Sequence, residues 1–100
     1  MPEFSAKSTA QLLTCHPKLQ QVFAQVIKHW DCIILEGART VAQQEENVRR
    51  GVSKTMDSKH LPRPDGYSYA VDAAPLPLDW QDLERFRAFG GFVLGVAAML

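Results

Sequence analysis

Hydrophobic residues recur at helical spacing in the first third of the chain. Between Pro17 and Trp30 they fall three or four positions apart, which gives a helix one apolar stripe that needs a core to face. The stripe consists of Leu19, Val22, Phe23, Val26, Ile27 and Trp30. Pro17 suits the first position of this helix, because the N–H that proline lacks would be unsatisfied there anyway. A shorter helix is predicted before it, capped by Ser8 and running to about Leu13.

Two short apolar runs predict strands. The run from Cys32 to Leu35 contains β-branched residues and is typical of a buried strand, and residues 70–75 predict a second strand closed by prolines. Between them, Thr40 can cap a polar third helix, with Gln43 in the capping-box position and Gly51 at its end. Prolines and glycine make residues 52–69 a turn-rich loop.

The last predicted helix begins at Trp80 after a cap at Asp79, and from Phe89 onward it is apolar nearly all round. Its apolar face consists of Leu83, Phe86, Phe89, Val93, Val96 and Met99 or Leu100. An apolar run of about twelve residues is shorter than the ~20 that cross a bilayer, so we expect this helix to be covered by protein. Because the usual helix-stop residues are missing, we expect the chain to be truncated at its C-terminus, with self-association through the uncovered helix as an alternative.

These elements predict one α+β domain over residues 1–100. The expected fold is a small antiparallel sheet with helices on one side. A chain of 100 residues has room for a single domain only.

Charge and composition exclude several kinds of partner. Eleven basic residues balance eleven acidic ones, which argues against nucleic acid and against an anionic membrane surface. The N-terminus lacks the apolar core of a signal peptide. Cys15 and Cys32 are not at metal-binding or redox spacing, and we interpret them as free buried thiols.

The residues that could carry chemistry are His60 and Asp72, at opposite ends of the turn-rich loop. Imidazole nitrogen and carboxylate oxygen are common zinc ligands, and a catalytic zinc takes three protein ligands and a water. Taken alone, such a pair is more often a structural hydrogen bond, and Arg39 alone would be more often a surface ion-pair residue. Asp65, inside the loop, is interpreted as a turn residue.

Several motifs occur in one order along the chain, and together they narrow the choice. They are Glu36–Thr40, Gln43-Gln44, residues 53–55, the Ser-x-His block at Ser58–His60, Gly66 and the Ala-x-Asp block at 70–72. This series resembles the superfamily of D-alanyl-D-alanine carboxypeptidases and L-alanyl-D-glutamate endopeptidases. The most similar branch is that of the phage endolysins, and the resemblance runs from about Phe4 to Leu100. The resemblance implies a fold like that of Hedgehog and the D-alanyl-D-alanine peptidases, with its last strands missing from this chain.

The resemblance implies roles for four residues. His60 and Asp72 match the first two zinc ligands, Arg39 matches the arginine that steadies the substrate carbonyl and the developing oxyanion, and Ser58 matches a serine near the substrate. The twelve-residue separation of His60 and Asp72 is wider than the compact family signature. In the family, a third histidine ligand and an acidic general base follow the last helix. We therefore expect two of three ligands in this chain, and weak activity at most.

The expected function is zinc-dependent cleavage of peptidoglycan stem peptides, as in phage endolysins. The protein would be made in the cytoplasm of a bacterial host and would reach the wall after release by another lysis protein. Two alternatives stay open: a D-alanyl-D-alanine carboxypeptidase, and a non-catalytic cell-wall-binding remnant of the same fold.

Overall fold

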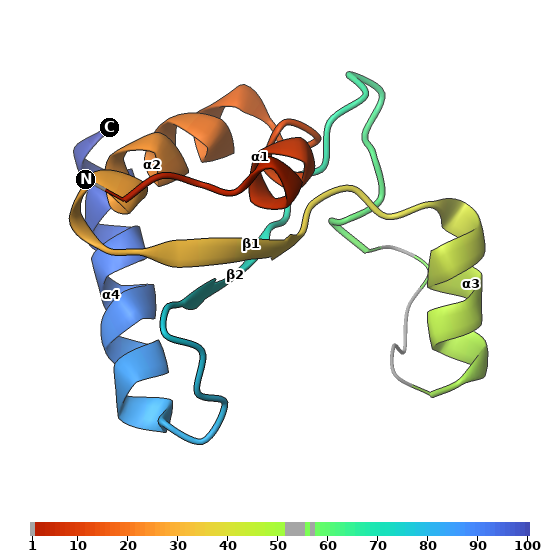
Figure 1. Ribbon diagram of the computed structural model, residues 1–100. Helices are drawn as coiled ribbons and strands as arrows, with labels where there is room; N and C mark the ends of the chain where they lie inside the picture. The colour runs from red at the N-terminus through yellow and green to blue at the C-terminus, as the bar shows by residue number, and fades with distance from the viewer. Residues whose placement is uncertain (1, 52–55, 57) are drawn as a thin grey trace.

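The computed structural model describes residues 2–51, 56 and 58–100. Within these residues the fold is α+β, with four helices and a two-stranded antiparallel sheet (Figure 1). The elements in chain order are α1 (Ala6–Leu12), α2 (Pro17–His29), β1 (Cys32–Glu36), α3 (Val41–Arg49), β2 (Asp72–Pro75) and α4 (Leu83–Met99). The predicted fold class is confirmed. The motif at residues 53–55 lies outside the described residues.

The first helix is capped by a different serine from the one predicted. The Ser5 hydroxyl accepts the N–H of Ser8 at 3.1 Å, so α1 begins at Ala6. Ser8 is buried inside the helix, where its hydroxyl accepts the N–H of Ile34 at 3.0 Å. Either serine satisfies the local rule for a cap, and the contact with Ile34 is what makes Ser8 a helix residue.

The last helix also begins later than predicted. The Asp82 carboxylate accepts the N–H of Arg85 at 3.1 Å and caps α4, whereas Asp79 accepts the N–H of Gln81 in the turn before it. The prediction of a cap at Asp79 was therefore wrong by three residues. By contrast, α2 begins at Pro17 as predicted, and the Thr40 hydroxyl accepts the N–H of Gln43 as a cap should.

The sheet brings its two strands together with one irregularity. Cys32 lies opposite Pro75 and Ile34 lies opposite Ala73, but a register shift between Ile34 and Glu36 places Glu36 opposite Asp72. Such irregularities re-aim side chains at the end of a strand. Here the shift sets two carboxylate residues beside each other.

Side chains of α1 and of the turn after it cover the outer edge of β1. Besides the bond from Ile34 to Ser8, the Gly37 N–H donates to the Gln11 side chain at 3.1 Å. The Ala38 N–H donates to the Thr14 hydroxyl at 2.7 Å. These bonds satisfy backbone groups that an open edge would leave unpaired. They also fix the segment that leads from β1 toward Arg39.

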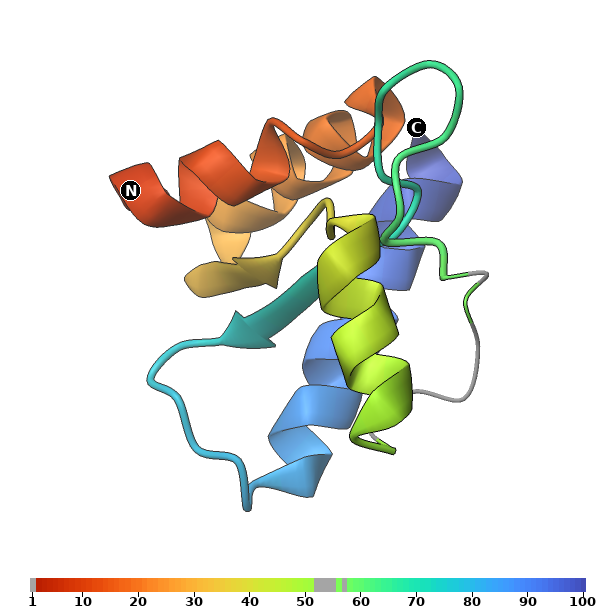
Figure 2. The ribbon, with the colours of Figure 1, turned by 90° about the vertical axis from the view of Figure 1, so that its right-hand side faces the viewer.

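Helix α2, the sheet and α4 lie close together (Figure 2). The core lies between them, and the predicted stripe of α2 is its centre. Its buried members are Leu12, Val22, Phe23, Val26, Ile27, Cys32, Ile34 and Phe89. Trp30 packs edge-on against Phe89, with ring centroids 5.4 Å apart. This packing attaches the first half of α4 to the end of α2.

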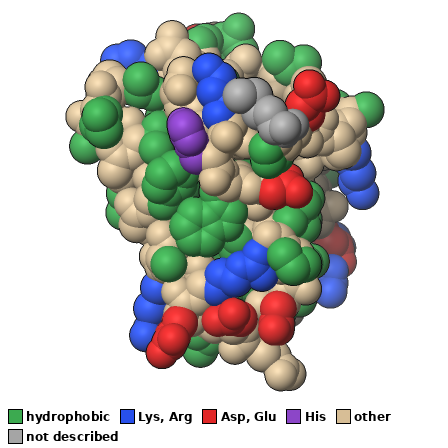
Figure 3. Space-filling view, turned by 60° about the vertical axis from the view of Figure 1, so that its left-hand side comes forward, with side chains coloured by type: hydrophobic (Ala, Val, Ile, Leu, Met, Phe, Trp, Pro, Cys, Tyr) green, Lys and Arg blue, Asp and Glu red, His purple; other side chains and the backbone are tan. Residues whose placement is uncertain are grey.

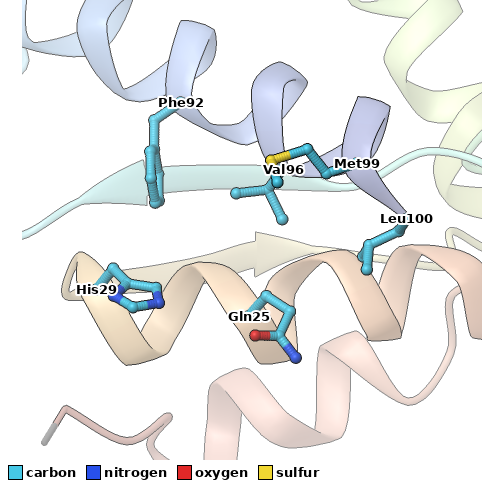
Figure 4. A pocket seen from close by; sticks show the side chains of 6 residues that line it. All are labelled: Gln25, His29, Phe92, Val96, Met99 and Leu100. Carbon is cyan, nitrogen blue, oxygen red and sulfur yellow. The ribbon is translucent and has the colours of Figure 1, made fainter.

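Much of α4 is left open to solvent. Met99 is 88% exposed and Leu94 is 72% exposed. An apolar pocket of about 350 Å³ lies between α2 and α4, lined in part by Phe92, Val96 and Leu100 (Figure 4). Hydrophobic side chains are also spread over the middle of the face shown in Figure 3. Among the described residues, no helix is long and apolar enough to cross a membrane.

Both cysteines are free and buried, as predicted. Burial, helped by the charge of Asp31, raises the pKa of Cys32 to about 12, and burial also raises the pKa of Cys15. Because the thiolate is the reactive form, we expect neither cysteine to react quickly with Ellman's reagent at pH 8 in the native protein. Both should react at once in about 6 M guanidinium chloride, because this concentration unfolds the protein and exposes the thiols. Fast reaction of either thiol in the native state would show that the thiol is not buried in solution.

Candidate active site

Three potential metal ligands meet at one end of the sheet. Glu36 comes from the end of β1, His60 from the loop after α3, and Asp72 from the start of β2. One ligand atom from each lies within 4.8 Å of the others. The structure therefore brings His60 and Asp72 together across the loop, and it adds Glu36, for which the sequence suggested no role.

His60 is held in one orientation by the backbone. Its Nδ1 lies 2.8 Å from the Gly37 carbonyl oxygen, and since a carbonyl can only accept, Nδ1 carries the proton and donates it. The other ring nitrogen, Nε2, faces Asp72, with 3.4 Å between Nε2 and Oδ2. Proteins usually orient a metal-binding histidine in this way, with a backbone carbonyl accepting from one ring nitrogen so that the other is free to bind the metal.

The turn that carries His60 is fixed at both ends. The Ser58 hydroxyl accepts the N–H of His60 at 3.2 Å. The carbonyl of His60 accepts the N–H of Arg39 at 2.7 Å. The contact that the structure shows for Ser58, which was predicted to lie near the substrate, is thus a hydrogen bond within the turn of His60. The backbone of Arg39 is hydrogen-bonded to the same turn.

His60 and Asp72 are spaced as two ligands of one zinc ion would be. Two ligands of one tetrahedral zinc, at bond lengths of about 2.0 to 2.2 Å, lie about 3.4 Å apart. His60 Nε2 and Asp72 Oδ2 show this separation of 3.4 Å. The Asp72 side chain is 57% exposed and the His60 side chain is 12% exposed, so the carboxylate faces solvent while the ring is largely covered. Glu36 Oε1 instead lies on the Nδ1 side of the ring, 3.5 Å from Nδ1.

Arg39 lies beside this cluster with its side chain 14% exposed. One guanidinium nitrogen pairs with the Glu36 carboxylate, and the other donates to the Gln44 side-chain oxygen at 2.6 Å. Arg39 Nε is buried and has no hydrogen-bond partner among the described residues. The arginine singled out in the sequence is therefore linked to His60 through Glu36.

The loop between His60 and Asp72 contains an ordered turn. Asp65 accepts the N–H of Tyr67 at 2.9 Å and the hydroxyl of Tyr69 at 2.5 Å. The bond from Tyr69, followed by the bond from Tyr67, lowers the pKa of the Asp65 carboxyl. Gly66 adopts a φ of 86°, which favours glycine. Asp65 thus acts as the turn residue that its sequence context predicts.

The fold and the site define the class: a small α+β domain with a candidate metal site of one histidine and two carboxylates beside a clamped arginine. The chain belongs to the phage L-alanyl-D-glutamate peptidase family, whose sequence model matches residues 2–98. The resemblance inferred from the motifs is confirmed.

Two relatives illustrate the family. Over 94 residues the chain is 37% identical to the L-alanyl-D-glutamate peptidase of Escherichia phage T5, an alignment that covers 86% of this chain and 65% of that protein. The structure of this chain is similar to that of the L-Ala D-Glu endopeptidase ChiX of Serratia marcescens, with a TM-score of 0.81 and 27% identity. That match covers 98% of this chain and 74% of ChiX. The chain thus spans 65% of the length of the curated relative.

Proposed function

We propose that this protein is a zinc-dependent endopeptidase that cleaves the L-Ala–D-Glu bond of peptidoglycan stem peptides. The observation that carries the proposal is the convergence of His60 Nε2 and Asp72 Oδ2 at the spacing of two zinc ligands. Both relatives are named for the same bond, which favours it over the D-Ala–D-Ala bond.

In this proposal His60 and Asp72 hold the metal, and the Gly37 carbonyl holds His60 in the correct tautomer. Zinc supplies Lewis-acid chemistry, which activates water near neutral pH and polarises a carbonyl. Glu36 is the third potential ligand in the cluster, but its carboxylate is already paired with Arg39. We therefore assign Glu36 to the positioning of Arg39 rather than to metal binding.

Arg39 would stabilise the transition state. A guanidinium directed at the scissile carbonyl oxygen interacts most strongly when negative charge develops there, which lowers the barrier rather than merely tightening substrate binding. Ser58, on the turn that carries His60, would contact the peptide next to the cleaved bond. The proposed site of action is the cell wall, reached from the host cytoplasm with the help of another lysis protein.

The exposed apolar side of α4 supports the proposal that this helix is covered in the working protein. Leu94, Met99 and Leu100 are all mostly exposed, and a large exposed apolar surface usually marks a contact. Self-association of the chain is one way of covering it, and sedimentation across a range of concentrations would detect it.

The test of the proposed function uses a purified disaccharide–pentapeptide from peptidoglycan that ends in D-Ala–D-Ala, with zinc, with a chelator, and with zinc restored. Mass spectrometry should show a peptide that begins with D-Glu and a disaccharide that keeps L-Ala, only when zinc is present. Release of a single D-Ala would instead support the carboxypeptidase. Binding of the muropeptide without cleavage would support the non-catalytic wall-binding module and contradict the peptidase.

A further inference from the structure

Helix α3 buries a single side chain, and it is a polar one. In Figure 1, α3 stands apart from the other helices, and of its nine residues only Gln44 is buried, with 0% exposure. Burying an amide is unfavourable unless its polar atoms are hydrogen-bonded. We therefore expect the buried Gln44 side chain to have a hydrogen-bond partner.

That partner is Arg39. The Gln44 side-chain oxygen accepts from Nη1 at 2.6 Å, while the Glu36 carboxylate pairs with Nη2. One contact on one nitrogen would let the guanidinium pivot about that contact. Contacts on both terminal nitrogens fix the plane of the group, because the guanidinium is rigid and its donors point in set directions.

We propose that Gln44 is a positioning residue that, together with Glu36, aims Arg39 at the bond to be cleaved. This inference rests on the role of Arg39 in the proposed function. A donor group that is already oriented needs no reorganisation when charge develops on the substrate, and a small misplacement of such a group slows the reaction strongly.

The neutrality of Gln44 is part of the inference. Glu36, Asp72 and His60 already gather two carboxylates within 4.8 Å. A third carboxylate at position 44 would keep the contact with Arg39, but it would offset more of the positive charge that attracts a developing oxyanion. An amide holds the guanidinium without this effect. Gln44→Glu should therefore preserve the orientation of Arg39 and still reduce catalysis.

The experiment compares Gln44→Met, Gln44→Glu and the control Gln43→Met. Gln43 is the same residue type at the next position of α3, but it is exposed and its amide bonds to Asn47. The direct readout is the Arg39 Nε–H resonance in ¹⁵N NMR, assigned with Arg39→Lys. We expect Gln44→Met to shift and broaden this signal, Gln44→Glu to keep it sharp, and Gln43→Met to leave it unchanged.

The second readout is kinetic. With the muropeptide as substrate, Gln44→Met should lower kcat by roughly 10- to 100-fold while KM and zinc affinity stay within about twofold. An unchanged Arg39 signal in folded Gln44→Met would overturn the proposal. The proposal would also be overturned if Gln44→Met and Gln44→Glu lost the Arg39 signal equally and lowered the midpoint of unfolding equally. Gln44 would then act through packing. If the wild-type protein cleaves nothing while the signal still responds, the positioning of Arg39 stands and the peptidase function fails.

Discussion

Replacing His60 with alanine is expected to weaken zinc binding by at least about 100-fold, since losing a residue that only hydrogen-bonds to a metal ligand already costs roughly 10- to 100-fold. The imidazole is held by the Gly37 carbonyl, with Nε2 directed at Asp72. Without it, the described site offers carboxylates only, one of which is paired with Arg39. Zinc prefers nitrogen and sulfur donors alongside oxygen, so the remaining set should hold it poorly.

The measurement is a zinc titration by calorimetry, supported by metal analysis of the purified protein. His29→Ala is the matched control, because His29 is exposed on α2 and contacts the ring of Phe92 rather than the cluster. Wild-type protein and His29→Ala should bind one zinc with the same affinity. Equal affinity in His60→Ala would show that the metal, if bound, sits elsewhere in the molecule.

Replacing Gly37 with alanine is expected to destabilise the protein by about 1–3 kcal/mol or more and to disturb the site. A Cβ at this position would lie 2.3 Å from the Gln11 carbonyl oxygen, 2.3 Å from the Thr14 hydroxyl and 3.0 Å from the Cys15 sulfur. The first of these atoms belongs to the backbone and cannot swing away. The segment would have to move, and the Gly37 carbonyl that orients His60 would move with it.

Urea unfolding measures the loss of stability, and Gly91→Ala is the control. Gly91 lies in α4 with nothing within 4 Å of an added Cβ. Alanine there should leave the stability unchanged or raise it by about 0.5–1 kcal/mol, because alanine is the better helix former. The Gly37→Ala protein should also bind zinc more weakly than Gly91→Ala. A Gly37→Ala protein with wild-type stability would contradict the prediction and show that the atoms around position 37 leave room for a Cβ.

Residue periodicity was sufficient to predict the elements that bury one continuous face. The stripe of α2 and the β-branched run of β1 became the core, because apolar spacing in a short chain has few ways of being buried. Helix starts were less well predicted. Ser5 and Ser8, like Asp79 and Asp82, satisfy the same local capping rule, and only contacts with distant residues or neighbouring turns separate them.

The residues of the site were likewise predictable only in part. The motifs identified the family and singled out Arg39, Ser58, His60 and Asp72, whose catalytic roles remain predictions. The roles of Glu36 and Gln44 could not be predicted from the sequence. Glu36 meets Asp72 only because of a register shift in the sheet, and Gln44 is buried only because α3 lies against Arg39.

The sequence by itself therefore determined the class of fold, the main helices and strands, the free thiols and the family. All of these follow from residue types at fixed spacings along one segment. The tertiary structure decided which polar atoms face each other at the end of the sheet. It oriented the His60 ring with a backbone carbonyl and clamped Arg39 between a carboxylate and an amide. The bond between His60 and Gly37 joins residues 23 positions apart. Even the short-range bonds of Arg39 to Glu36 and Gln44 depend on distances and directions in space, which residue spacing along the chain does not contain.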